Sequence, residues 1–238
     1  TLTDLYEASP LGTFSSFFYG TIQSALFTLL AVYATSMNFT ILEISIVTFL
    51  LAVSGAVAQF PIGKLSDIYD RRKVIVISTF GAALFAILAI IVSKQMYLPD
   101  GLATSKKWFY IFFVLFSFCS LPMFSLILAH TNDNISKEKF VAAGAGLQFV
   151  FGLGAISGPF LCSIFMDLVG SNGFFIFLFF FHAVIGFFGI YRMGVRKTIE
   201  NPDSQFVAMP QTITPAGIEL NPTTEPIEEP EKNFEEKF

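Results

Sequence analysis

A short charged run separates two long apolar segments and holds the side chains best suited to chemistry in this chain. The run Gly63-Lys-Leu-Ser-Asp67-Ile-Tyr-Asp70-Arg71-Arg72 contains two carboxylates and three cations, and Lys73 follows it. A carboxylate beside a helix end can accept hydrogen bonds from the free N–H groups of a neighbouring helix N-terminus. Arginine can bind a carboxylate or a carbonyl through two parallel hydrogen bonds. Contacts of this kind can be made in one conformation and broken in another, which is what a gate requires.

The alternative is a plain connecting loop whose cations only set the orientation of the chain in a membrane. Gly63, Leu65 and Asp67 add a pattern beyond charge, and this pattern favours the gate. We expect the preceding helix to end near Pro61, so that Asp67 lies just beyond it. Asp70 supplies a second acid that can pair with either arginine of the run.

The composition indicates which elements position this run. The chain has 238 residues, of which 54% are hydrophobic and 13% are charged, and its mean hydropathy is +0.67. Soluble domains carry about a quarter charged residues. The deficit predicts that most of the surface faces lipid, so the lipid bilayer is the first expected partner.

Six apolar segments are long enough to cross a bilayer, which takes about 20 helical residues. Only helices satisfy their own backbone polar groups in lipid over runs this long, so we predict an all-α membrane protein with six transmembrane helices. The predicted helices are Pro10–Met37, Ile44–Ile62, Val74–Val92, Trp108–Ala129, Phe140–Leu168 and Phe174–Tyr191.

The distribution of lysine and arginine predicts the orientation. With both ends of the chain in the cytoplasm, nine cations of the six-helix region and its connections face inward and three face outward, which fits the positive-inside rule. Residues 1–9 then form a cytoplasmic segment and residues 10–197 the six-helix domain. The region 198–238 contains six prolines and is acidic, so we predict a disordered cytoplasmic tail.

Several segments together resemble a known family. The run at Gly63 is similar to the cytoplasmic loop known as motif A of the major facilitator superfamily (MFS). With it, Ser9-Pro10-Leu11-Gly12, the segment from Ala129 to Asp133, and the segment from Gly152 to Pro159 resemble the C-terminal half of YcaD-type transporters. These are bacterial inner-membrane members of that superfamily. The run departs from motif A at Ile68, where arginine is frequent, and at Asp70, where glycine is frequent.

This resemblance, which covers about residues 9–196, implies one half of a twelve-helix fold and hence a partial chain. Its expected partners are a missing N-terminal six-helix half, a small-molecule substrate of unknown identity and a coupling ion. The expected function is secondary transport by alternating access in the bacterial inner membrane. One alternative is a six-helix protein that pairs with a second copy of itself. Another is a membrane scaffold or sensor that does not transport and uses the acidic tail as an interaction arm.

Polar residues within membrane helices are costly and therefore carry functional hypotheses. By the family architecture, the expected cavity-lining residues are Tyr19, Gln23, Ser117, Ser120 and Gln148. Their alternative role is hydrogen bonding between helices. His130, Asn132 and Asp133 are candidates for a cytoplasmic gate at the end of the fourth helix.

Gly154, Gly158 and Pro159 place small residues and a potential bend in the fifth helix. They are candidates for a pivot, and their alternative role is static close packing. The sequence shows no catalytic constellation, no cluster with the spacing of metal ligands and no phosphate-binding glycine loop outside the spans. It also has no basic patch for nucleic acid. We therefore expect no enzyme activity, no cofactor and no metal.

Overall fold

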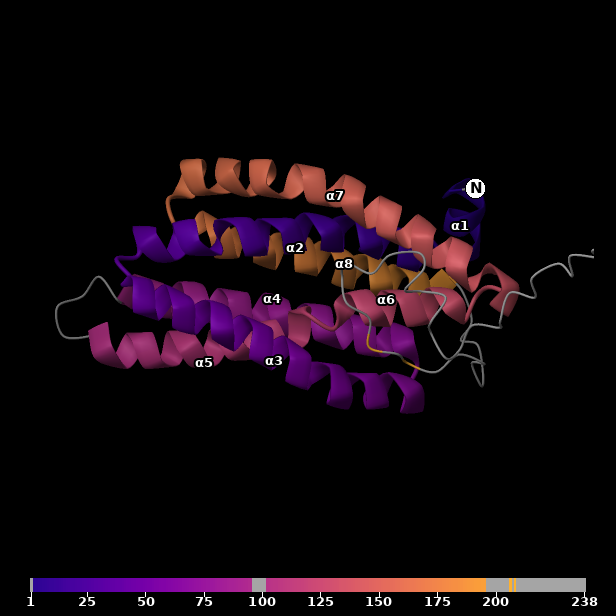
Figure 1. Cartoon of the computed structure of the whole chain (residues 1–238), viewed down its shortest axis with the longest axis horizontal. Helices are drawn as coiled ribbons and strands as arrows, with labels where there is room; N and C mark the ends of the chain where they lie inside the picture. Colours follow the sequence, from indigo (N-terminus) through magenta and orange to yellow (C-terminus); the bar gives the residue numbers. More distant parts are fainter. Residues whose placement is uncertain (1, 96–101, 196–205, 207, 209–238) are drawn as a thin grey trace, which may run out of the picture.

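The structure is a computed structural model that describes residues 2–95, 102–195, 206 and 208. Long helices run side by side in an elongated bundle, with the short α1 at one end (Figure 1). The elements are α1 (Leu2–Ala8), α2 (Pro10–Ser36), α3 (Ile41–Ile68), α4 (Arg71–Gln95), α5 (Leu102–Ser120), α6 (Met123–Asn132), the 3₁₀ helix η1 (Lys137–Lys139), α7 (Phe140–Val169) and α8 (Gly173–Val195).

Six helical stretches among the described residues are long and apolar enough to cross a membrane. They comprise α2, α3, α4, a combined stretch of α5 and α6 (Ser105–Asn132), a stretch of η1 and α7 (Lys137–Val169), and α8. No strand occurs in the part of the chain that the structure describes. The predicted all-α fold with six transmembrane helices is therefore confirmed.

The second membrane helix continues past its expected end. Pro61 lies inside α3, which runs to Ile68, and the backbone N–H of Tyr69 still donates to the carbonyl of Leu65 at 2.9 Å. Proline removes one hydrogen bond, but membrane helices tolerate this loss where neighbouring groups compensate. The prediction of a loop after residue 62 is therefore wrong, because only Tyr69 and Asp70 separate α3 from α4.

The fourth membrane helix is interrupted where one continuous helix was expected. α5 ends at Ser120, and Pro122 occupies the position directly before α6 without a side-chain capping bond. A carbonyl at the interruption, that of Leu121, accepts a hydrogen bond from the hydroxyl of Tyr19 at 3.1 Å. Because the phenol of α2 satisfies a backbone group at the break, the interruption is tolerated at membrane depth.

α2 and α7 make the most extensive helix contact in the structure, and they lie side by side in Figure 1. A Cβ atom at Gly154 would overlap the carbonyl oxygen of Phe17, and one at Gly158 would overlap that of Thr21. From the other side, Gly20 lies against the carbonyl of Phe151. In lipid, where helices gain little from the hydrophobic effect, such close backbone approach is a main source of association.

α3 and α7 leave apolar faces uncovered. In an apolar stretch of 18 residues, only 28% of the residues of α3 and 22% of those of α7 are buried, against 67% for the stretch of α5 and α6. The uncovered side chains include Phe49, Val57 and Phe60 on α3 and Ile156 and Phe160 on α7. These faces must contact lipid or another protein segment.

Candidate functional site

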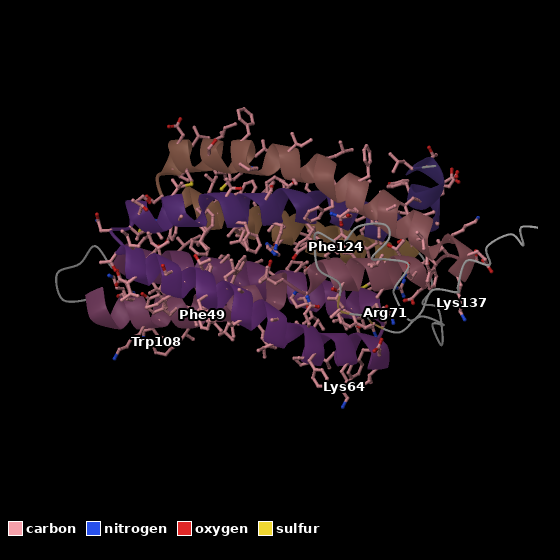
Figure 2. The ribbon with its side chains drawn as sticks, in the orientation of Figure 1. Phe49, Lys64, Arg71, Trp108, Phe124 and Lys137 are labelled. Atoms are coloured by element: carbon pink, nitrogen blue, oxygen red, sulfur yellow. The ribbon has the colours of Figure 1, made fainter. Side chains whose placement is uncertain are left out.

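Arg71 lies at the centre of a buried ion-pair cluster at one end of the bundle. Figure 2 shows Arg71 at the same end as Lys64 and Lys137, while Trp108 lies at the opposite end; we call these the Arg71 end and the Trp108 end. The Arg71 side chain is only 3% exposed. Its Nη1 donates to Asp133 Oδ1 at 2.7 Å, and its Nη2 donates to Asp67 Oδ1 at 2.9 Å.

The cluster ties three helices together. Arg71 is the first residue of α4, Asp67 lies in the last turn of α3, and Asp133 directly follows α6. Nη1 of Arg71 also donates to the carbonyl of Ala129 in the last turn of α6 at 2.9 Å. A cation is favourable at the C-terminus of a helix, where the carbonyls carry partial negative charge. Arg71 therefore fixes the relative positions of α3, α4 and α6.

Asp67 is the most accessible member of the cluster. Its side chain is 39% exposed, against 8% for Asp133. Besides the arginine, its Oδ1 accepts a hydrogen bond from the backbone N–H of Phe206 at 2.8 Å, whereas we expected a donor at a helix N-terminus. Asp67 thus retains accessible surface through which it can bind a further donor.

Asp70 pairs with Arg72, the second of the two expected possibilities. Nε of Arg72 donates to Asp70 Oδ1 at 3.1 Å, and Nη2 donates to Oδ2 at 2.8 Å. The backbone N–H of Arg72 donates to the same Oδ1 at 3.0 Å, so Asp70 also caps the start of α4. This pair secures the tight α3–α4 turn, a role that glycine at this position could not fulfil.

Phe206 departs from the prediction that residues 198–238 form a disordered tail. It is half-buried, and its ring packs against the core and directly over Gly63, where a Cβ atom would collide with the ring. The prediction rested on the proline and acid content of the region, which gives no sign that one aromatic residue packs on the bundle. Apart from Ala208, the remaining positions of the predicted tail lie outside the described residues.

The other gate candidates lie beside the cluster. Asn132 is buried, and its Oδ1 has no hydrogen-bond partner among the described residues. His130 is half-buried, and its carbonyl accepts a hydrogen bond from the side chain of Asn134 at 2.7 Å. The structure therefore gathers Asp133 into the ion-pair cluster, and His130 and Asn132 lie in the last turn of α6 directly before it.

Three of the expected cavity residues instead bond within the bundle. Tyr19 binds the helix interruption, and Ser117 donates to the carbonyl of Phe113 at 2.7 Å. The hydroxyl of Ser120 lies 2.9 Å from Nε2 of His182 on α8. All three are fully buried. In this conformation they do not line an open surface, and hydrogen bonding inside the bundle accounts for Tyr19 and both serines.

The two glutamine candidates differ from these hydroxyls. Gln23 is 3% exposed, and neither Oε1 nor Nε2 of its amide has a hydrogen-bond partner among the described residues. It lies one turn after Tyr19 on the same face of α2. Gln148 on α7 is half-buried. A buried amide without hydrogen-bond partners costs free energy. Gln23 is therefore the cavity candidate to which a ligand or a water molecule would supply the missing hydrogen bonds.

Two contacts were not predicted from the sequence. At the Trp108 end, Lys106 of α5 and Glu43 of α3 form an ion pair at 2.6 Å, and Glu43 also closes a capping box with Thr40. The Thr40-x-x-Glu43 spacing is a recognisable helix-start signal. At the Arg71 end, Ser9 Oγ lies 3.2 Å from Thr131 Oγ1.

Comparison with known proteins gives a consistent family assignment. The family model of the Major Facilitator Superfamily matches residues 12–222. An uncharacterized MFS-type transporter of Yersinia enterocolitica is 25% identical over 203 residues, which is 85% of this chain and 48% of the relative. The uncharacterized MFS-type transporter YfkF of Bacillus subtilis is 27% identical over 168 residues, which is 68% of this chain and 39% of the relative.

The chain therefore spans about half the length of the curated relatives that it matches. The match to the family model covers most of the chain, including the ion-pair cluster around Arg71 and, except for the first two residues of α2, the six apolar helices among the described residues. With six apolar helices, a charged turn between the second and third, and this match, the chain belongs to the major facilitator superfamily.

Proposed function

We propose that this chain is the C-terminal six-helix half of a bacterial inner-membrane transporter that moves a small solute by alternating access. The observation that carries the proposal is the pair of uncovered apolar faces on α3 and α7, in a chain that spans 48% of its Yersinia relative. A second six-helix half of similar size would cover both faces. These two helices are the least buried of the six, as a contact with a second half would require.

The ion-pair cluster supplies a gate in this proposal. Arg71 holds α3, α4 and α6 as one rigid corner, while the exposed part of Asp67 is free to bind a helix N-terminus of the second half. That contact would form when the halves approach at the Arg71 end and break when they separate. Asp67 would thus stabilise one of the two states selectively, as alternating access requires.

Gln23 supports a neutral, hydrogen-bonding solute as the transported class. Its unpartnered amide offers both a donor and an acceptor, and the described middles of the membrane helices carry no Asp, Glu, Lys or Arg. In the proposal, opening of the two halves exposes this amide, and the solute supplies the missing hydrogen bonds. A coupling-ion site within this half would need neutral ligands.

The proposed orientation places the Arg71 end in the cytoplasm. Two exposed isoleucines at opposite ends of α3, Ile41 and Ile68, offer matched positions for a test. With Cys119 and Cys162 replaced by Ala, we expect an impermeant thiol reagent to label Ile41→Cys in intact cells. Ile68→Cys should react only after the membrane is permeabilised. The opposite labelling pattern would reverse the topology.

The gate is tested by Asp67→Asn in the protein expressed from its native reading frame. The substitution keeps the shape and removes the charge that favours a helix N-terminus. Hydrogen bonds to charged groups contribute about 1.5–3 kcal/mol. We therefore expect the ratio between the state closed at the Arg71 end and the state open there to shift about ten- to a hundredfold. Paired spin labels across the mouth at the Arg71 end measure this ratio.

Lys64→Gln is the matched control, since Lys64 is exposed and lies one turn before Asp67 on α3. It removes one charge from the same helix end without touching the cluster. If Asp67→Asn and Lys64→Gln leave the same distance distribution as the unmodified protein, the gate proposal fails. The turn would then serve only to orient the chain.

A further inference from the structure

Phe206 occupies part of the surface to which the second half must bind in the proposed gate. The backbone N–H of Phe206 donates to Oδ1 of Asp67 at 2.8 Å. This is the same type of donor that a helix N-terminus would present. The contact joins residues 139 positions apart in the sequence, so it is a tertiary contact and no local turn accounts for it.

The ring of Phe206 adds an apolar contact to this hydrogen bond. It packs against the hydrophobic core and against the backbone of α3 at Gly63, and only a residue without a Cβ atom permits that approach. Gly63 and Asp67 are four residues apart, so they lie on one face of α3. One face of the helix thus offers a flat apolar surface and a carboxylate, and Phe206 uses both.

We propose that Phe206 is an autoinhibitory ligand of the Gly63–Asp67 face. While Phe206 is bound, Oδ1 of Asp67 accepts its N–H and the ring covers Gly63, so a helix of the second half must displace Phe206 to pack on this face. Release of Phe206 frees the carboxylate for the gate. The docking contact stands on the geometry alone, whereas its inhibitory effect rests on the proposed function.

Docking is measured first, with spin labels at Ile68→Cys and Ala208→Cys in the protein expressed from its native reading frame. Both positions are exposed, and Cys119 and Cys162 are replaced by Ala. We expect a dominant short distance in the otherwise unmodified protein. Phe206→Ala removes the ring, and we expect the ratio of docked to free forms to fall about tenfold, as loss of a half-buried phenyl ring implies.

Gly63→Ala gives an independent route to the same result, because the new methyl group fills the space of the ring. Gly194→Ala is its control: Gly194 also lies towards the Arg71 end, in the last turn of α8, and a Cβ atom there meets nothing within 4 Å. We expect undocking with Gly63→Ala and none with Gly194→Ala. A distance distribution that neither Phe206→Ala nor Gly63→Ala changes would overturn the docking.

Inhibition is measured second, with labels across the mouth at the Arg71 end. We expect Phe206→Ala to raise the closed population about tenfold, as release of a competing ligand requires. The double variant Phe206→Ala/Asp67→Asn should not show this rise. If Phe206→Ala undocks residue 206 and leaves the mouth unchanged, Phe206 does not inhibit. If Asp67→Asn alone changes nothing, the proposed gate is wrong, while the docking result still stands.

Discussion

Replacing Arg71 with Met is expected to lower the free energy of unfolding by about 3–5 kcal/mol, the usual cost of leaving a buried charge without its partner. Asp133 would lose its 2.7 Å ion pair while its side chain stays 8% exposed, and the carbonyl of Ala129 would lose a donor. Asp67 contributes less, because its 39% exposure allows water to replace the arginine. Thermal unfolding in detergent, followed by intrinsic fluorescence, measures the change.

Lys73→Met is the matched control, because Lys73 lies two residues along the same helix and is exposed. It removes the same type of charge and should change the unfolding free energy by less than about 0.5 kcal/mol. The double variant Arg71→Met/Asp133→Asn should recover part of the loss, since it removes the stranded carboxylate. Equal effects of Arg71→Met and Lys73→Met would show that the cluster contributes nothing to the fold.

The charged turn illustrates what the sequence could predict and what it could not. The residue types at Asp67, Arg71 and Asp133 identified groups that the structure brings together, because ionised side chains at a membrane surface need partners. The pairing of Arg71 with Asp133 depends on the distance between α4 and α6, which no local pattern encodes. The helix end was also misplaced, because Pro61 is a reliable stop signal in water and a weaker one in lipid.

For three of the cavity candidates, the sequence could not separate the two roles that we considered, for a related reason. Tyr19 and Ser120 are polar residues in apolar helices, and this pattern is the same for a ligand site and for a bond inside the bundle. Only the three-dimensional structure shows that Tyr19 reaches the carbonyl of Leu121 and that Ser120 reaches His182. The contact of Phe206 was missed because disorder was predicted from the average composition of residues 198–238, which prolines and acids dominate. A single aromatic residue provides the contact, and it changes that average little.

Gly154→Ala is expected to destabilise the protein by about 2–3 kcal/mol, in the upper range for overpacking. The added methyl group would overlap the carbonyl oxygen of Phe17, which is backbone and cannot rotate away. Separation of α2 from α7 would also weaken the 3.1 Å hydrogen bond from Thr21 Oγ1 to the carbonyl of Gly154. The loss should appear as a lower midpoint in thermal unfolding.

Gly152→Ala provides a control with the opposite expected sign. Gly152 lies two residues earlier on α7, and a Cβ atom there meets nothing within 4 Å. Alanine is favoured over glycine in helices by up to about 1 kcal/mol, so this variant should be neutral or slightly stabilised. If both variants gave the same midpoint, close contact between the backbones of α2 and α7 could not be what holds the two helices together.

The same pair of variants separates a pivot from static packing at Gly154. If α7 rocks against α2 during transport, the added methyl group should obstruct one state more than the other. Spin-label distances across the Arg71 end would then shift for Gly154→Ala and not for Gly152→Ala. If α2 and α7 move as one body, Gly154→Ala should lower stability and leave the ratio of states unchanged. Stability and state ratio together therefore distinguish the two roles, because static packing affects the first alone.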